Sequence, residues 1–418
     1  MTKVTDLEKA REYNRVKKYE ESLKHYQSYL ESGEKLSEQD KGRYAWDIYF
    51  VKIKNSTNIN EMEENVKELI QYTSQRNASR KDLPCAFTIS ILKLMKFYSD
   101  NITFNNNAYK LIAWADKLNP QYLSNTQAKR DDSHKYNSNK ENWYLQITKG
   151  LFEIKKYKEV IELSNEALET IPVFNNSNDI WFKYKISKSY RELGEYDTAL
   201  EYLEDIVKVK NEWFFFNEIA INYFKKEDYD SSAKWAAKAA LSHDGKIESK
   251  LKLFLLIGEI LKIKGYEDEY IWHKYLVYTI RNANEWSQEE GWAEELASYE
   301  LDLENTDYKT IYDELSNLWL SLKFIGQERK YGSITKVFDH QKSGFIKSGK
   351  DSYYFNAYEF QDDKSFIYEG TKVSFFLEKA YNKKTGEEVE NAVNIYCEEY
   401  WLKTGINQEK KKKIELNQ

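Results

Sequence analysis

The strand-forming part of this chain lies in one stretch near the end of the sequence. It contains GSITKV (332–337), SGFI (343–346), YYF (353–355), EGTKVSF (369–375) and AVNI (392–395). Apolar residues alternate with polar ones in these segments, which is the period of half-buried β-strands. Everything before this stretch has the pattern of helices. The sequence therefore predicts a helical chain with one small β-domain near its end.

The composition predicts a folded chain with several domains or with an array of repeats. Its 418 residues are too many for one hydrophobic core, and 41% of them are hydrophobic and 16% aromatic. Only three prolines occur, at Pro84, Pro120 and Pro172, which favours long helices joined by short turns. Because the formal net charge is −6, any contact with nucleic acid must be local.

The cysteines and the N-terminal residues indicate the class of protein. Cys85 and Cys397, with no paired Cys/His spacing, exclude a disulfide framework and a zinc finger. The N-terminal residues lack the apolar run of a signal peptide, and no window approaches about 18 uninterrupted apolar residues. The abundance of Lys, Asn, Ile and Tyr is typical of an AT-rich bacterial genome. We therefore expect a cytoplasmic bacterial protein without a membrane span.

A short turn pattern recurs along the helical part. Tyr196 follows Gly194-Glu195, and Tyr229 follows Glu227-Asp228, 33 residues further on. Tyr19, Tyr157 and Tyr266 follow similar polar residues. A period close to 34 residues is typical of stacked helix pairs.

This pattern resembles the tetratricopeptide repeat (TPR), in which a small residue lets two helices approach and a turn tyrosine fills the groove between them. The positions that match are Ala10, Tyr13, Tyr19, Ser22, Tyr26, Tyr190, Tyr196, Ala199, Ala220, Tyr223, Tyr229, Ala236, Gly258 and Gly265. Thr148 stands where the family usually has glycine or alanine. The resemblance implies an all-α superhelical solenoid whose concave face binds an extended peptide or a helix of a protein partner.

The repeat pattern also predicts boundaries and partner contacts. We expect TPR-like repeats at 1–120 and 142–284, a polar linker or mobile loop at 121–141, and capping helices at 285–328. Candidate partner contacts on the first helix of each pair are Asn142, Lys183, Asn217 and Asn222. The alternative is that these four are ordinary polar surface residues.

Residues 330–397 resemble a cold-shock domain, a small five-stranded barrel of the OB type. The chain is then multidomain, with an all-α solenoid followed by a small all-β barrel. Such barrels usually bind single-stranded nucleic acid on an aromatic face. The resemblance implies nucleic-acid contacts at Lys336, Phe338, Phe345, Tyr354, Asn356 and Phe360. Lys336 and Ser343 replace aromatic residues of the family, and Asn356 replaces a histidine.

The alternation also predicts which side chains of the barrel point inward. If Phe345 and Tyr354 point outward, then Gly344, Ile346, Tyr353 and Phe355 point inward. Acidic and basic residues nearly balance over 330–397, so we expect a weak electrostatic contribution to binding.

Two flanking segments are expected to be separate from the barrel. Residues 325–331 are predicted to form a hinge, with protease cleavage at Arg329 or Lys330. The tail 398–418 contains the run Lys410–Lys413 and is predicted to be solvated.

No sequence pattern indicates catalysis. The chain has neither a Gly-rich phosphate loop nor a His-Glu-x-x-His sequence, so we expect no enzyme activity, cofactor or metal. Two functional classes remain. The first is an adaptor that binds a protein through the array and single-stranded RNA or DNA through the barrel, in stress response, RNA metabolism or anti-phage defence. The second is a protein scaffold or self-associating regulator whose barrel is a docking module.

Overall fold

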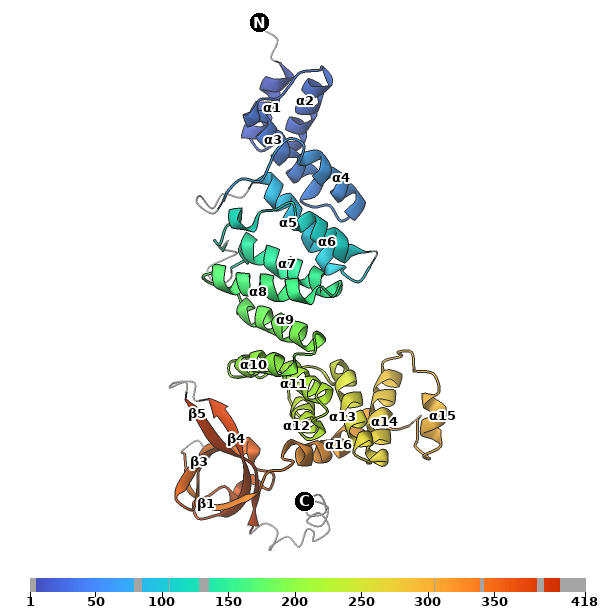
Figure 1. Cartoon of the computed structure of the whole chain (residues 1–418), viewed down its shortest axis with the longest axis vertical. Helices are drawn as coiled ribbons and strands as arrows, with labels where there is room; N and C mark the ends of the chain where they lie inside the picture. The colour runs from blue at the N-terminus through green and yellow to red at the C-terminus, as the bar shows by residue number, and fades with distance from the viewer. Residues whose placement is uncertain are drawn as a thin grey trace. The chain divides into compact units, whose positions relative to one another are not determined.

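The chain forms two compact units, Met1–Tyr202 and Leu203–Gln418. The computed structural model describes residues 5–78, 85–104, 106–127, 135–303, 305–338, 342–381 and 387–398. The first unit is helical, and the second combines helices with a β-barrel (Figure 1). Among the described residues, no helix is both long enough and apolar enough to cross a membrane. The Lys410–Lys413 run lies outside the described residues.

The helices follow one another in antiparallel pairs. Those of the first unit are α1 (Asp6–Arg15), α2 (Tyr19–Glu31), α3 (Glu38–Ile48) with the π-helix η1 (Tyr49–Ile53), α4 (Ile59–Leu69), α5 (Ala86–Asp100), α6 (Asn107–Ala115), α7 (Asn139–Glu153), α8 (Tyr157–Thr170) and α9 (Asn178–Glu192). Helix α10 (Tyr196–Val207) crosses the division between the units. The second unit continues with α11 (Trp213–Lys225), α12 (Tyr229–Ala240), α13 (Leu251–Ile263), α14 (Glu267–Ala283), α15 (Trp292–Ala297) and α16 (Tyr308–Lys323).

The same turn joins helices at five places in the described chain. Each turn has one residue with positive φ, namely Lys17, Lys155, Gly194, Glu227 or Gly265. The amide of the next residue donates to a carbonyl five residues back, for example Lys18 N to Tyr13 O at 2.9 Å and Asp228 N to Tyr223 O at 3.0 Å. This bond closes the C-terminus of the first helix. A tyrosine then begins α2, α8, α10 and α12, so these tyrosines lie at turns between helices, as the repeat pattern predicted.

Small residues 12 positions apart bring the two helices of a pair together. The hydroxyl of Ser22 donates to Ala10 O at 2.9 Å, and that of Ser232 donates to Ala220 O at 2.8 Å. Ser187 donates in the same way to Ala199 O at 2.8 Å. At Gly258 an added Cβ would lie 3.1 Å from the Cβ of His273, so glycine keeps α13 close to α14. Both units therefore contain a TPR-like solenoid of helix pairs.

The loop between α6 and α7, which was predicted to be a linker or a mobile loop, is bonded to the helices in its described part. Lys140 N donates to Ser124 O at 3.1 Å, and the Asn125 side chain donates to Thr170 O at 3.3 Å. The Gln127 side chain donates to Val173 O at 3.3 Å. These bonds tie the loop to the start of α7 and to the end of α8. Residues 128–134 of this segment lie outside the described residues.

The β-domain is a closed five-stranded barrel. Its strands are β1 (Lys330–Val337), β2 (Ser343–Ser348), β3 (Asp351–Asn356), β4 (Lys372–Tyr381) and β5 (Glu388–Cys397). They close in the order β1-β2-β3-β5-β4, with β3 parallel to β5 and the other pairs antiparallel. This is the strand order of an OB-type barrel.

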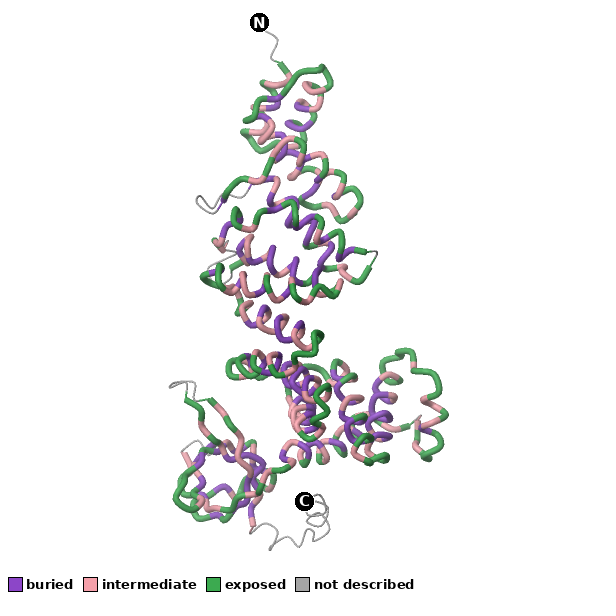
Figure 2. Tube along the Cα trace, viewed as in Figure 1, coloured by how far each residue is buried: buried purple, intermediate pink, exposed green. Residues whose placement is uncertain are grey.

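The inside of the barrel follows the predicted alternation. Ile346 and Phe355 are fully buried, Tyr353 is nearly so, and Phe345 and Tyr354 point outward, which confirms the predicted faces. Gly344 is needed because a Cβ at this position would collide with the carbonyl oxygen of Lys336. Figure 2 shows the buried residues gathered inside the barrel and between the helices of each unit.

Candidate nucleic-acid interface

The outer face of β1–β3 carries three rows of directly opposed residues. The middle row is Lys336, Phe345 and Tyr354, since Lys336 pairs with Phe345 and Phe345 pairs with Tyr354. The second row is Phe338, Ser343 and Asn356. Phe338 N donates to Ser343 O at 3.0 Å, and Ser343 pairs with Asn356. The third row is Ser333, Lys347 and Ser352. The register thus gathers five of the six predicted barrel contacts in two neighbouring rows.

Three aromatic rings form one continuous strip across this face. The ring centroids of Phe338 and Phe345 are 5.8 Å apart, and those of Phe345 and Tyr354 are 5.9 Å apart, both in edge-on contact. The ammonium of Lys336 lies 5.4 Å from the centroid of the Phe338 ring. Tyr354 is 36% exposed, and Phe345 is half-buried. Each of these rings offers a surface on which a base can stack.

Phe360 does not belong to this strip, so its prediction as a nucleic-acid contact is wrong. It is only 4% exposed and packs in the barrel core, where it forms a bridge with Ile395. Phe360 lies beyond the end of β3, where the alternation that places Tyr354 no longer applies. Asn356 caps the short helix η4 (Ala357–Glu359), because its side-chain oxygen accepts from Tyr358 N at 3.3 Å.

Tyr358 is an exposed aromatic side chain beside the strip that sequence reasoning missed. It is 69% exposed, and it lies close enough to Tyr354 for the two phenols to interact electrostatically. Burial of part of the ring and the neighbouring carboxylate of Glu359 raise the pKa of Tyr358. The sequence signal was the short spacing of Tyr354 and Tyr358, but only the turn at η4 shows that both rings lie on one side.

Charge is distributed unevenly over the barrel. The described residues from 330 to 356 include five lysines and one carboxylate, Asp351. The described residues from 357 to 398 include three lysines and nine carboxylates. The predicted balance of charge over 330–397 therefore hides a basic β1–β3 segment and an acidic remainder. A basic segment next to exposed aromatic rings is the combination that single-stranded nucleic acid requires.

The β4 side of the barrel packs on the helices of the second unit. The Phe376 ring of β4 stacks on Phe324 at the end of α16, with centroids 4.4 Å apart and planes 9° apart. The Glu378 carboxylate accepts from Lys238 of α12 at 2.6 Å and from Lys323 of α16 at 2.9 Å. Burial alone would raise the pKa of Glu378, but these two ammonium groups lower it to about 2. Helix α12 therefore holds β4 through one ion pair, and α16 holds it through one ion pair and one aromatic contact.

Arg329, predicted to be a protease site in a hinge, is an anchor of the barrel. Its guanidinium lies between the rings of Phe376 and Tyr396, 4.6 and 4.7 Å from their centroids. It donates to Asn394 O at 2.6 Å and to the Ser374 hydroxyl at 3.2 Å. Burial lowers its pKa. The expectation of cleavage at Arg329 is wrong, because this side chain is enclosed by β4 and β5. Cleavage at the exposed Lys330 stays a prediction.

The predicted partner contacts of the array occupy different environments. Asn142, Lys183 and Asn217 are partly exposed. Asn142 accepts a hydrogen bond from the Asn137 side chain at 3.2 Å. Asn222 is fully buried and donates to Glu218 O at 2.8 Å, so it cannot contact a partner. It follows Phe215 and Glu218 on the buried stripe of α11, which the seven-residue spacing from Phe215 could have indicated.

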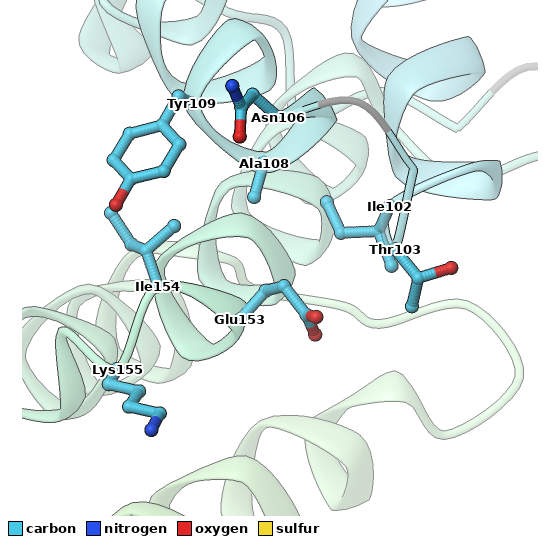
Figure 3. A pocket seen from close by; sticks show the side chains of 8 residues that line it. All are labelled: Ile102, Thr103, Asn106, Ala108, Tyr109, Glu153, Ile154 and Lys155. Carbon is cyan, nitrogen blue, oxygen red and sulfur yellow. The ribbon is translucent and has the colours of Figure 1, made fainter.

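Two observations on the described residues bear on catalytic and metal chemistry. Within the described ranges, no group of three or more His, Cys, Asp or Glu could hold a metal ion. A hollow of about 310 Å³ lies between the α5–α6 loop and the α7–α8 turn, lined by Ile102, Thr103, Asn106, Ala108, Tyr109, Glu153, Ile154 and Lys155. Figure 3 shows Glu153 and Lys155 well apart in this hollow. They are not arranged as the neighbouring acid and base that proton-transfer chemistry requires.

Comparison with known proteins adds a likeness to solved helical structures only. No protein-family model matches the chain, and no curated protein matches it. A MamA fragment from Desulfovibrio magneticus RS-1 is 14% identical, covering 46% of this chain and 96% of that one, with a TM-score of 0.34. YrrB, described as a TPR protein with an unusual peptide-binding site, is 15% identical over 51% and 92%, with a TM-score of 0.33.

A third structure, PilF from Pseudomonas aeruginosa, is 11% identical over 69% of this chain and 99% of that one, with a TM-score of 0.37. Likenesses at these TM-scores carry no argument about function. The assignment of TPR-like helix pairs therefore rests on the repeated turns and the small-residue contacts described above.

Proposed function

We propose that this chain is a non-catalytic adaptor that binds single-stranded RNA or DNA on the outer face of β1–β3. The observation that carries the proposal is the continuous strip of Phe338, Phe345 and Tyr354 with Lys336 at its end. Apolar rings that are exposed side by side on the surface of a protein mark an interaction site. The strand order of the barrel and its basic β1–β3 segment support a nucleic-acid ligand, in keeping with the resemblance to a cold-shock domain.

The strip is sufficient for moderate affinity. Stacking of one base contributes about 1–3 kcal/mol, so two bases on Phe345 and Tyr354 contribute about 2–6 kcal/mol. Lysines around the strip add the attraction to phosphates that supplies most non-specific binding. We therefore expect dissociation constants on the order of micromolar, because about 8 kcal/mol corresponds to that affinity.

The helix pairs give the adaptor its second part. Stacked pairs of this kind present extended surfaces, and we propose that they bind a protein partner in the cytoplasm. The partly exposed Asn142, Lys183 and Asn217 remain proposed contacts, whereas Asn222 is withdrawn from the set.

The second candidate function is that of a pure protein scaffold. The observation that favours it is the packing of β4 against α12 and α16, which shows that this barrel already uses one side for protein contact. In that case the aromatic strip would take a protein and not a nucleic acid.

Binding of a fluorescently labelled, unstructured oligonucleotide to the full chain separates the two functions. We expect the anisotropy of labelled oligouridylate or oligothymidylate to rise at micromolar protein and low salt, and a duplex of the same length to bind more weakly. A full chain that leaves the anisotropy unchanged at low salt would exclude the adaptor and favour the scaffold.

A further inference from the structure

The middle row of the nucleic-acid face continues beyond the aromatic strip. Tyr354 of β3 lies opposite Asn391 of β5, and Asn391 lies opposite Glu378 of β4. Adjacent strands are about 4.8 Å apart, so the row reaches Glu378 about 10 Å beyond Tyr354. The barrel surface therefore leads directly from the rings to Glu378.

Three lysines of the helices converge at that end of the row. Lys238 and Lys323 donate to Glu378 at 2.6 and 2.9 Å. Lys234, one turn before Lys238 on α12, donates to the side-chain oxygen of Gln327 at 2.8 Å. Burial lowers the pKa of Lys234, and the nearby ammonium groups of Lys238 and Lys323 lower it further against the opposing effect of Glu378. Three lysine side chains thus gather around the Glu378 carboxylate.

A second carboxylate in this region does not remove the surplus of positive charge. This is Glu359, which accepts from Asn394 N at 3.2 Å, and even with it two carboxylates face the three lysines. The lysines remain within reach of a ligand, since the side chains of Lys238 and Lys323 are 28% and 17% exposed. The exposed ring of His243 also lies near Glu359. The region can therefore accept one further negative charge.

We propose that a single strand stacked on Phe345 and Tyr354 continues over Asn391 and places a phosphate at Lys234 and Lys238. The helices α12 and α16 then complete the nucleic-acid site that the barrel begins. This inference rests on the proposed function of the β1–β3 face. A nucleic acid fits better than an acidic protein segment because the lysines continue the row of a stacking surface.

Lys234→Ser is the variant that tests this proposal. It removes one ammonium group and leaves both ion pairs of Glu378 in place, so the barrel should stay docked. Lys252→Ser is the matched control, because Lys252 is an exposed lysine on the neighbouring helix α13. Far-UV circular dichroism and the thermal midpoint check that both variants fold as the wild type does.

The measurement is the salt dependence of binding to an oligothymidylate of about ten nucleotides, which is within the usual length of one site. A single phosphate contact contributes about 0.7 to the slope of log affinity against log salt for a single strand. We expect Lys234→Ser to flatten the slope by about 0.7 and to weaken binding about fivefold near 50 mM salt. The slope for Lys252→Ser should equal that of the wild type.

The outcomes separate this inference from the proposed function. If Phe345→Ala/Tyr354→Ala weakens binding while Lys234→Ser leaves slope and affinity unchanged, the strand stops at the barrel and the inference is wrong. The same holds if an acidic peptide of equal length and charge displaces the oligonucleotide from the wild type but not from Lys234→Ser. If the wild type binds no oligonucleotide, the proposed function fails first.

Discussion

Phe345 and Phe376 are outward-facing aromatic residues on two sides of the same barrel, and they have different surroundings. The Phe345 ring contacts those of Phe338 and Tyr354 and remains partly in solvent. Phe376 is stacked on Phe324 of α16 beside the ion pairs of Glu378. Alternation along a strand therefore tells which residues point outward, but not which of them another element covers. The uncovered side is the one available for a ligand.

The largest expected effect concerns the aromatic strip on the outer face of β1–β3. Replacing Phe345 and Tyr354 together by alanine should lower the affinity for a poly-pyrimidine single strand at least tenfold, because each stacked base contributes about 1–3 kcal/mol. The thermal midpoint should change little, since both rings are partly in solvent. Fluorescence anisotropy measures the affinity, and Tyr368→Ala, which removes an exposed tyrosine outside the strip, is the control. Equal losses in both variants would argue against a defined strip.

Acid should weaken the packing of α16 on α14 and leave the outer face of β1–β3 unchanged. Helix α16 is held to α14 by the bond from Trp319 Nε1 to His273 Nε2 at 2.8 Å, while His273 Nδ1 donates to Glu269 O at 2.6 Å. Burial lowers the pKa of His273 to about 4, so the folded state holds the ring neutral. The stabilisation is complete above the unfolded pKa of about 6.5 and is lost as pH falls toward 4.

At pH 5 the expected loss is about 2 kcal/mol, since about 1.4 kcal/mol corresponds to each pH unit below the unfolded pKa. Hydrogen exchange of α14 and α16 between pH 7 and 5, corrected for intrinsic rates, measures it. His273→Gln should be less stable at pH 7 and should lose this part of the pH dependence. The three rows on the outer face of β1–β3 contain no histidine or carboxylate, so their share of the oligonucleotide affinity should stay nearly constant while the protein remains folded.

Loss of the contact between Phe376 and Phe324 should lower the stability of the docked barrel and leave the binding of an oligonucleotide to the aromatic strip unchanged. Phe376→Ala removes the ring that stacks on Phe324 and should destabilise the docked barrel by about 2 kcal/mol, less than a fully buried phenylalanine would. Hydrogen exchange measures this loss, and we expect it to become faster in β4 and at the end of α16. Oligonucleotide affinity within about twofold of the wild type would agree with a barrel that stays docked on α12 and α16. A loss equal to that of Phe345→Ala/Tyr354→Ala would show that the binding of bases on β1–β3 itself depends on this docking.

The smallest expected effect is that of salt on the affinity of the β1–β3 face for an oligonucleotide. If the strand makes two phosphate contacts, affinity should fall about sevenfold between about 50 and 200 mM salt. The neutral total charge of the barrel predicts a weaker effect than the five lysines of the β1–β3 segment do. Titrations at several salt concentrations decide between these two expectations.

Much of the fold could be predicted from local sequence. The turn residues before Tyr157, Tyr196 and Tyr229 define the helix pairs because a positive φ and a short turn end each first helix. The alternation around Phe345 and Tyr354 placed the barrel core correctly. Phe360 could not be placed in this way, because it follows a turn where the period of two no longer holds.

Contacts between elements distant in sequence could not be predicted. Arg329 looks like part of a polar hinge in the sequence, but its guanidinium lies between two rings contributed by β4 and β5. Glu378 looks like a solvent-facing residue, yet α12 and α16 each direct a lysine to it. These pairings depend on how the barrel packs on the helices, which no local pattern records.

Photochemical cross-linking of oligothymidylate to the full chain tests the central claim most directly. Mass spectrometry of the adducts identifies the residues that touch the bases. The account predicts adducts in the peptides that carry Phe338, Phe345 and Tyr354, and their loss in Phe345→Ala/Tyr354→Ala. Adducts that form elsewhere and leave β1–β3 unmodified would contradict the assignment of this face as the binding site.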